Sequence, residues 1–412
     1  MKAIFIFCLM MLTFNSNAAT AVINGNWYHQ GIFSQQTWYI VAGKLTQQKP
    51  KTINKTLDLN GGFVLPPYAE AHNHNLQNPW LAQNFHQRYI KDGVFYGLMM
   101  CSSHQDYKDT INMLATLPLS IDMVGACISS SDGHPLRMAI QTEPGQPEIK
   151  PTEVYDSSYV VVDSIDDISK KWPLFAANKS NWVKIILVHN EQINRRANPK
   201  FFGVNGLNPE VVKPLVNFLQ TKGLRVAAHV ESAADYAIAV EAGVDLIAHL
   251  PGYQWWQDYS PELYQLSDAS IGMAAAKKIP IVATAGVTTL FKSNRDQQLV
   301  KVKAMQQHNL QRLQQAGVKV LIGSDRFDGN VLAEVDYLRS LSVFNDHQLL
   351  EMLVSDTVRF LYPQRAVGTF AEGYEANFLV LDANPLHDWS ALRRIQNRVW
   401  QGQLVSPLAK PN

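Results

Sequence analysis

The chain has 412 residues, of which 46% are hydrophobic and 17% are charged. This composition can build a large apolar core and excludes a disordered, collagen-like or coiled-coil protein. Because 36 basic residues are balanced by 35 acidic ones, no net charge favours a nucleic acid or an anionic membrane as partner. A small-molecule substrate is therefore expected. Three cysteines without a Cys-x-x-Cys spacing exclude a disulfide scaffold and a structural zinc module.

Residues 1–18 have the pattern of a secretory signal peptide. Lys2 precedes an apolar run from Ala3 to Phe14, and the small-x-small site Ser16-Asn17-Ala18 follows. The run is too short to cross a bilayer core of about 30 Å, and no later stretch of about 18 residues is apolar throughout. We therefore expect a secreted, periplasmic protein without a membrane span.

Two cysteines, Cys101 and Cys127, remain after removal of the signal peptide. Both end apolar runs, which favours two buried thiols. A disulfide between them is the alternative in an oxidising compartment.

The apolar pattern changes twice along the mature chain. Short alternating runs predict β-strands in residues 19–66, and β character returns in residues 366–412. Between them, in residues 67–365, short apolar runs alternate with helical periods, which is typical of a parallel α/β sheet. The expected strands are Ala69–His74, Val94–Cys101, Ile121–Ile128, Trp182–Val188, Arg225–His229, Asp245–His249, Ile279–Ala283 and Lys319–Ile322. Since eight such strands close a barrel, we predict a (β/α)8 TIM barrel with a small composite β-sandwich formed by the two terminal segments.

Two expected strands end in matching histidines. The segments 223–229 and 243–249 share the order glycine, apolar strand, histidine, so that His229 and His249 should stand at the same end of neighbouring strands. A single histidine at a strand end is more often a structural residue, but two in register favour a metal site.

Further ligand types follow other strands. In the segment from Glu70 to His74, the side chains of His72 and His74 project to one side of a strand and can bind one ion together. At the far end of the predicted barrel, Asp325 follows the last strand. An aspartate there can also merely cap a helix.

Lys184 lies inside the predicted strand Trp182–Val188, where a buried strand has no place for an unpaired cation. Burying its ammonium group would cost several kcal/mol, so the amine is expected to be neutral or paired with a carboxylate. A neutral amine can react with carbon dioxide, and the resulting carbamate could bridge two cations.

In this order, His72, His74, Lys184, His229, His249 and Asp325 resemble the ligands of the amidohydrolase superfamily, in particular its imidazolonepropionase-like and dipeptidase branch. The similarity extends into the tail from Gly368 to Leu386. It implies one or two divalent ions at the barrel mouth, with zinc first and manganese, iron or cobalt as alternatives. His72, His74 and Asp325 would bind one ion, His229 and His249 the other, and a carbamate on Lys184 would bridge them.

The resemblance also implies a mechanism. The ions would lower the pKa of bound water to about 7, and Asp325 would act as the catalytic acid and base. The expected reaction is hydrolysis of an amide-type C–N bond in a dipeptide, an N-acyl amino acid or a cyclic amide.

Substrate contacts are expected in the loops that follow the strands. Three candidates lie in two loops: His134, Arg137 and Tyr253. Relatives often place a histidine near the scissile group in the loop that contains His134, and a surface turn is the alternative for this segment. A wall formed by Trp255 and Trp256 beside Tyr253 competes with simple packing of these rings.

Three more arginines follow barrel strands, namely Arg195, Arg196 and Arg326. A guanidinium group can bind a substrate carboxylate through two parallel hydrogen bonds, although such arginines can equally face solvent.

Other functions fit the sequence less well. Lactone, ester or phosphotriester hydrolysis could use the same metal site, and a non-catalytic ligand-binding barrel would not need six intact ligands. The sequence leaves open whether the protein forms a homo-oligomer.

Overall fold

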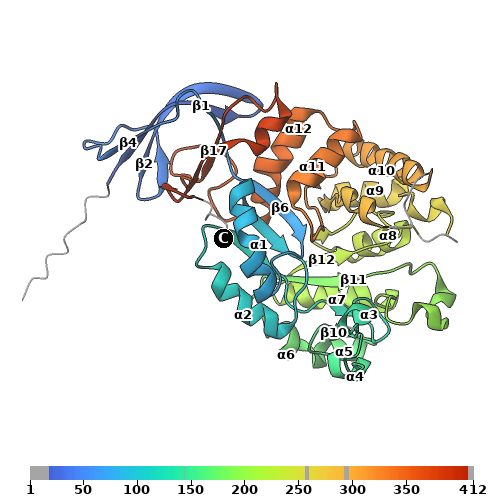
Figure 1. The fold of residues 1–412 in the computed structure, drawn as a ribbon. Helices are drawn as coiled ribbons and strands as arrows, with labels where there is room; N and C mark the ends of the chain where they lie inside the picture. Colours follow the sequence, from blue (N-terminus) through green and yellow to red (C-terminus); the bar gives the residue numbers. More distant parts are fainter. Residues whose placement is uncertain (1–17, 143, 256–258, 292–296, 407–412) are drawn as a thin grey trace, which may run out of the picture.

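The computed structural model describes residues 18–142, 144–255, 259–291 and 297–406. The predicted signal peptide therefore lies outside the described residues, except for Ala18. The described chain has a mixed α/β fold, in which parallel strands are covered by helices and a separate sheet, built from the strands near both ends of the chain, lies at one side (Figure 1).

The parallel strands form two sheets. A three-stranded sheet has the order β6-β7-β8, and a seven-stranded sheet has the order β10-β9-β11-β12-β13-β14-β15. The strands of the first sheet are β6 (Tyr68–Asn73), β7 (Val94–Met99) and β8 (Ser120–Met123). Those of the second are β9 (Ile128–Ser129), β10 (Val160–Val161), β11 (Trp182–Ile186), β12 (Arg225–His229), β13 (Leu246–Ile247), β14 (Ile281–Val282) and β15 (Val320–Leu321). Each of the expected parallel strands is thus present, although several are shorter than predicted.

The third expected strand, 121–128, is divided into β8 and β9. The first part pairs with β7, whereas Ile128 in the second part pairs with Ile185 of β11. One chain segment therefore links the two parallel sheets by changing its partner.

The other edges of the two sheets also meet. The backbone N–H of Ala71 in β6 donates a hydrogen bond of 2.8 Å to the carbonyl of Ile322, next to β15. This contact brings the first and the last parallel strand side by side.

Alternate residues of the strands belong to different apolar clusters. Val226 and Ala228 of β12 pack in the large cluster that includes the helices, whereas Ala227 packs in a smaller one. The smaller cluster collects side chains from both parallel sheets, among them Ala71, Leu98, Ala227, Leu246, Val282 and Leu321. Both faces of the strands are therefore buried, which explains their nearly continuous apolar sequences.

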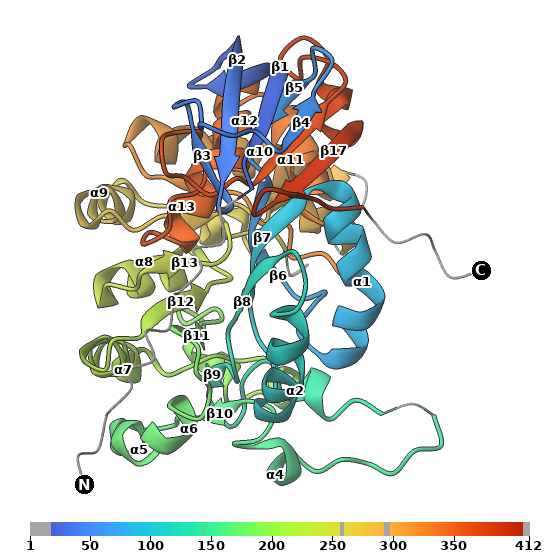
Figure 2. The same ribbon diagram turned by 90° about the vertical axis from the view of Figure 1, so that its left-hand side faces the viewer.

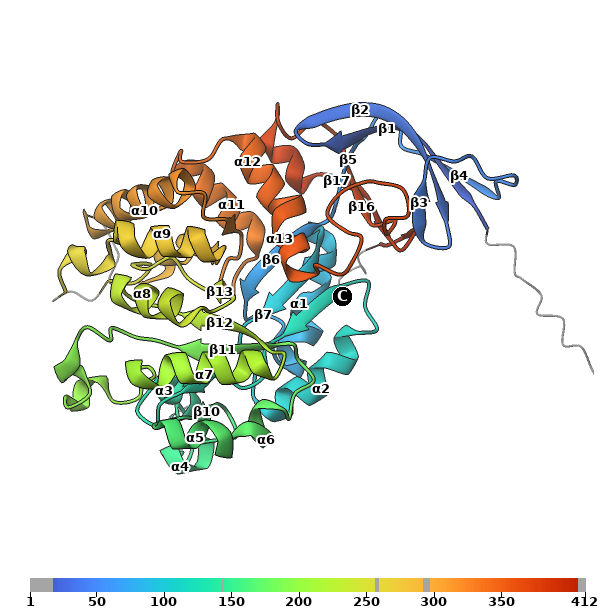
Figure 3. The same ribbon diagram turned by 180° about the vertical axis from the view of Figure 1, so that it is seen from behind.

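Helices cover the outer side of the parallel strands, and Figure 3 shows α7, α8 and α9 following one another along it. The helices are α1 (Pro79–Asp92), α2 (His104–Leu114), α3 (Leu136–Ala139), α4 (Pro151–Val154), α5 (Ile165–Lys170), α6 (Trp172–Phe175), α7 (Pro209–Thr221), α8 (Ala233–Ala242), α9 (Asp268–Lys277), α10 (Gln297–Gln315), α11 (Val331–Ser340), α12 (Asp346–Glu351) and α13 (Thr357–Leu361). Local sequence sets their ends. In α8, Ser232 caps the N-terminus together with Asp235, and Gly243 ends the helix with φ of 81°.

The first and last described segments of the chain both contribute to the remaining sheet, which lies at the opposite end of the molecule from α4, α5 and α6 (Figure 2). Its strands are β1 (Thr20–His29), β2 (Ile32–Val41), β3 (Lys44–Thr46), β4 (Lys55–Asp58), β5 (Phe63–Leu65), β16 (Phe378–Leu381), β17 (Ile395–Trp400) and β18 (Gln403–Leu404). The antiparallel pairing of β5 with β16 joins the two ends. Trp27 from the first segment packs edge-on against Phe370 from the last, with the ring centroids 4.7 Å apart.

Cys101 and Cys127 form a disulfide, with their Cα atoms 5.6 Å apart. The expectation of two buried thiols is therefore wrong. Cys101 follows β7 and Cys127 precedes β9, so the folded chain brings the two residues within bridging distance. In the part of the chain that the structure describes, no helix is both long and apolar enough to cross a membrane.

Candidate metal centre and substrate cavity

The predicted ligands come from the carboxyl ends of the parallel strands. They are His72 at the end of β6 and His74 just after it, Lys184 in β11, His229 at the end of β12, His249 after β13 and Asp325 after β15. Because the strands are parallel, these ends lie on one rim of the fold. Active sites of α/β proteins occupy this rim.

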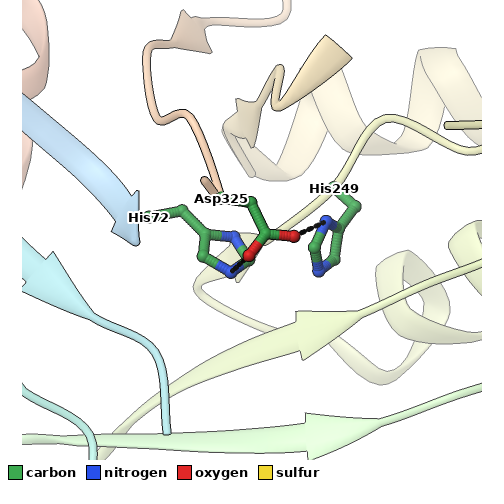
Figure 4. Close-up of side chains that lie close together, drawn as sticks. All are labelled: His72, His249 and Asp325. Carbon is green, nitrogen blue, oxygen red and sulfur yellow. Dashed lines mark ion pairs between the residues drawn. The ribbon is translucent and has the colours of Figure 1, made fainter. Parts of the chain in front are cut away.

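Asp325 lies among three histidines. Its Oδ1 atom is 3.5 Å from His72 Nε2 and 3.3 Å from His74 Nε2. Its Oδ2 atom is 3.7 Å from His249 Nδ1. Figure 4 shows the carboxylate between the rings of His72 and His249. Ligand atoms of His72, His249 and Asp325 all lie within 4.8 Å of one another, which is compatible with one shared ion.

The hydrogen bonds of His72 and His74 determine which ring nitrogen is available. Nδ1 of His72 bonds to the carbonyl of Ala248 at 2.8 Å, and Nδ1 of His74 bonds to Oε1 of Gln77 at 2.6 Å. Since both partners are acceptors, each Nδ1 carries the proton and each Nε2 keeps its lone pair. The two Nε2 atoms are 3.3 Å apart and both face Asp325.

His229 and His249 form the other side of the site, with ring centroids 4.5 Å apart. Nε2 of His229 lies 3.2 Å from Oε1 of Glu231, and Nδ1 of His249 lies 3.1 Å from Oγ1 of Thr284. Nε2 of His249 is buried and has no hydrogen-bond partner among the described residues. A buried ring nitrogen of this kind is available to a metal ion.

Lys184 is buried at the base of this group, with Nζ 3.4 Å from Nε2 of His72. Burial lowers the pKa of Lys184 to about 8, although the nearby Asp325 raises it. Burial likewise raises the pKa of Asp325 to about 7, against the lowering effect of Lys184. Both shifts favour the neutral forms. A neutral amine is the form that can be carboxylated.

The histidines are also held in their neutral forms. Burial lowers the pKa of His72 well below its usual range and that of His74 to about 3. Burial also lowers the pKa of His229, and it lowers the pKa of His249 well below its usual range. Metal ions bind neutral imidazole, so four histidines, one carboxylate and a lysine form a donor set that fits divalent ions.

A cavity of about 530 Å³ opens onto these residues. His74, Lys184, His229, His249 and Asp325 line one part of it. The remaining wall is largely apolar and includes Met138, Val188, Val204, Val287, Leu290, Phe291 and Phe327. The cavity can therefore hold a small molecule with an apolar part beside the polar cluster.

Three of the predicted substrate contacts line this cavity: His134, Arg195 and Tyr253. The ring of His134 stacks on His229 with the centroids 5.4 Å apart, and burial lowers its pKa to about 3. Arg195 is buried and packs over the ring of Phe201. Its guanidinium donates to Asn205 Oδ1, to the hydroxyl of Tyr259 and to the carbonyl of Val204.

The other three predicted contacts do not line it. Arg137 donates to the carbonyls of two residues in the 200–202 segment. Arg196 forms an ion pair of 2.8 Å with Asp132, and Arg326 pairs with Asp328 at 2.9 Å. These guanidinium groups hold loops together in this structure.

Sequence reasoning missed Glu231, which lines the cavity beside His229. Burial by itself would raise the pKa of Glu231, but the hydrogen bond with His229 lowers it to about 2, so the side chain is anionic. The sequence did offer a signal for Glu231: it follows the strand-end residue His229 by two positions, which is the same spacing that placed His72 and His74 together. Of the two predicted tryptophans, Trp255 is buried and stacks on Tyr264, and Trp256 lies outside the described residues.

A model of the amidohydrolase family matches residues 170–405. The chain belongs to the amidohydrolase family. This membership confirms the predicted superfamily and places the chain among hydrolases that act on carbon–nitrogen bonds.

Among curated proteins, the chain is 24% identical over 255 residues to an ochratoxinase of Aspergillus niger. The match covers 59% of this chain and 49% of the ochratoxinase, so the chain spans about half the length of that relative.

Solved structures with a similar fold include the A. niger ochratoxinase, with a TM-score of 0.73, 16% identity and coverage of 95% of this chain and 98% of that one. A Xaa-Pro dipeptidase with bound methionine has a TM-score of 0.73 and 15% identity, with 94% of this chain and 100% of that chain covered. A putative prolidase from Bifidobacterium longum has a TM-score of 0.70 and 18% identity, with 96% of each chain covered.

Proposed function

We propose that this protein is a metal-dependent amidohydrolase that cleaves an amide-type C–N bond in a small substrate. The observation that carries the proposal is the position of Asp325, whose carboxylate lies within 3.5 Å of Nε2 in both His72 and His74 at the edge of a substrate-sized cavity. The same rim supplies Lys184, His229 and His249.

In this proposal His72, His74 and Asp325 would hold one divalent ion and His229 and His249 a second, with carboxylated Lys184 between them. Zinc is the first choice because the ligands are mostly imidazoles, while manganese, iron and cobalt accept the same set. When bound, these ions supply Lewis acidity and an activated water for hydrolysis.

The side chains around the ions would perform the proton transfers. Asp325 would accept the proton of the attacking water and deliver it to the leaving nitrogen, because its carboxylate lies at the edge of the cavity and within 3.5 Å of Nε2 in both His72 and His74. Neutral His134, stacked on His229, would donate a hydrogen bond to the substrate.

The cavity supports a substrate with both an apolar and an anionic part. Its apolar wall would take a hydrophobic acyl group or side chain, while Arg195 would orient a carboxylate. A dipeptide or an N-acyl amino acid has both features. The names of two similar structures, a Xaa-Pro dipeptidase and a putative prolidase, support a peptide-like amide as the substrate class.

The proposal also includes the closure of the barrel, the second domain and secretion of the protein. The contact between Ala71 and Ile322 supports the closure of the two parallel sheets into a single (β/α)8 barrel over residues 67–365. Residues 19–66 and 366–412 would form a β-sandwich, and residues 1–18 would direct secretion to the periplasm. The Cys101–Cys127 disulfide supports an oxidising compartment.

A substrate screen tests this function. The purified protein, supplied with Zn²⁺, Mn²⁺ or Co²⁺, is assayed on dipeptides, N-acyl amino acids, lactones and phosphotriesters. Hydrolysis of N-acyl amino acids or dipeptides well above the other classes is expected. Turnover of lactones or phosphotriesters alone would contradict amide hydrolysis.

A further inference from the structure

Glu231 occupies a closely fixed position in the metal-binding rim. It follows the strand-end residue His229 by two positions and directly precedes Ser232, the N-cap of α8. The backbone N–H groups of Glu231 and Ser232 both donate to Oδ2 of buried Asp235. The backbone carbonyl of Glu231 also accepts a hydrogen bond of 3.2 Å from Gly252, which ties it to the loop of Tyr253.

One oxygen of Glu231 contacts two neighbours. Oε1 lies 3.2 Å from Nε2 of His229 and accepts a hydrogen bond of 2.8 Å from the hydroxyl of Tyr253. A carboxylate can only accept, so the proton of neutral His229 resides on Nε2. Nδ1 of His229 then keeps its lone pair and is the nitrogen that can bind a metal ion.

Tyr253 links this arrangement to the second histidine of the pair. Its ring stacks on His249 with the centroids 4.8 Å apart and the planes at 23°. The hydroxyl of the same residue bonds to Glu231, which contacts His229. Glu231 and Tyr253 therefore contact both histidines.

We propose that Glu231 and Tyr253 are positioning residues of the metal centre: Glu231 holds the proton of His229 on Nε2, and Tyr253 holds Glu231 in place and supports the ring of His249. This inference rests on the metal centre of the proposed function. In this inference Tyr253 and Glu231 act on the metal-binding histidines and need not touch the substrate. Tyr253 was predicted from the sequence as a substrate contact, so its role here is a different one.

Two substitutions of Glu231 separate hydrogen bonding from charge. In Glu231→Gln the amide oxygen can still accept from His229 and Tyr253, whereas Glu231→Met has a similar length and no acceptor. Partners that orient metal-binding histidines typically contribute 10- to 100-fold to metal affinity or activity. We expect Glu231→Met to bind Zn²⁺ about 10- to 100-fold more weakly at one site and Glu231→Gln to stay within about threefold of the unmodified protein.

A matched control is available in the pair Tyr28 and Glu351, where the tyrosine hydroxyl donates to Oε1 at 2.7 Å near the terminal sheet. Glu351→Met removes the same kind of contact far from the rim and should leave Zn²⁺ affinity unchanged. Tyr253→Phe keeps the ring on His249 but removes the hydroxyl, and should weaken binding less than Glu231→Met does.

The measurement is a Zn²⁺ titration against a competing chelator, with thermal unfolding of the metal-free proteins as a check on folding. Unchanged Zn²⁺ affinity in Glu231→Met would overturn the inference. An equal loss in Glu231→Gln and Glu231→Met would overturn positioning by a hydrogen bond. Because the readout is metal affinity, an unmodified protein that binds Zn²⁺ but hydrolyses no amide would contradict the proposed function and not this inference.

Discussion

The backbone N–H of Asp325 donates a hydrogen bond of 3.0 Å to the carbonyl of His72. This bond joins the segment after β15 to β6 and holds two proposed ligands from opposite ends of the parallel region at a fixed distance. Asp325 adopts φ of 50°, a left-handed conformation that aspartate tolerates better than most residues. The position of its carboxylate is therefore set by the backbone as well as by the histidines.

Replacing Asp325 with Asn should reduce the rate of catalysis more than it reduces the amount of bound metal. The amide oxygen can still act as a weak ligand, but the side chain can no longer accept a proton. We expect kcat to fall at least about 100-fold, as for a lost general base. Turnover is measured beside metal content on the same samples, and full activity in the variant would assign the base elsewhere.

Lys184→Ala tests the carbamate. Without the bridge, two cations would repel one another, so one ion should be lost and activity should fall by more than the 10- to 100-fold typical of supporting residues. Short carboxylic acids added to the assay should restore part of the activity by occupying the space of the carbamate. Retention of two tightly bound ions and normal turnover would contradict the binuclear centre.

The arginines are distinguished by their positions. Arg195 lines the cavity, whereas Arg326 is paired with Asp328 away from it. Arg195→Met should lower kcat/KM for substrates with a free carboxylate by about 10- to 100-fold, the value of a lost charged hydrogen bond, and should spare their amidated analogues. Arg326→Met serves as the control with a small effect on both. Equal losses on free and amidated substrates in Arg195→Met would mean that this arginine only supports its loop.

Glu334 provides a stability test at a residue that does not line the cavity. Its two oxygens accept the backbone N–H groups of Ala285 and Gly286, each at 2.7 Å, and burial raises its pKa from 4.5 to about 8. As pH rises, Glu334 loses its proton in the unfolded chain at about pH 4.5 and in the folded chain only at about pH 8. The contribution of Glu334 to the free energy of unfolding therefore falls between these two pH values.

In Glu334→Gln, the NH2 group of the amide must face one of the two N–H donors. The variant should be less stable by about 1–3 kcal/mol at pH 5, and the difference should shrink toward pH 8. Urea unfolding of both proteins in the presence of a chelator measures this. A difference that grows with pH would have the wrong sign for a raised pKa.

The disulfide should also contribute to stability. It closes a loop with a sequence separation of 26, for which the chain-entropy model gives about 3–4 kcal/mol. Cys101→Ser combined with Cys127→Ser should lower the free energy of unfolding by about this amount. Detection of two free thiols in the unreduced, denatured protein would contradict the bridge.

The repeated glycine, strand and histidine pattern was sufficient to predict the strands of His229 and His249 and their common rim. These signals are local, since each strand is a short apolar run that ends in a polar residue. The order of the ligands along the chain also identified the superfamily, which the family match over residues 170–405 confirms.

Features that depend on distant contacts were not predictable in the same way. The Cys101–Cys127 bridge depends on how the segment between β8 and β9 changes its pairing partner. The arginines looked equivalent in sequence because each follows a strand. In the fold, Arg195 lines the cavity, whereas Arg137, Arg196 and Arg326 do not. The role of Glu231 became visible only through its contacts with His229 and Tyr253.

The central claim is that metal ions at this rim are required for amide hydrolysis. The most direct test measures metal content and hydrolysis of an N-acyl amino acid before chelation, after chelation and after re-addition of Zn²⁺. We expect close to two bound ions per chain, loss of hydrolysis when they are removed, and recovery when they are restored. Undiminished hydrolysis by the metal-free protein would contradict it.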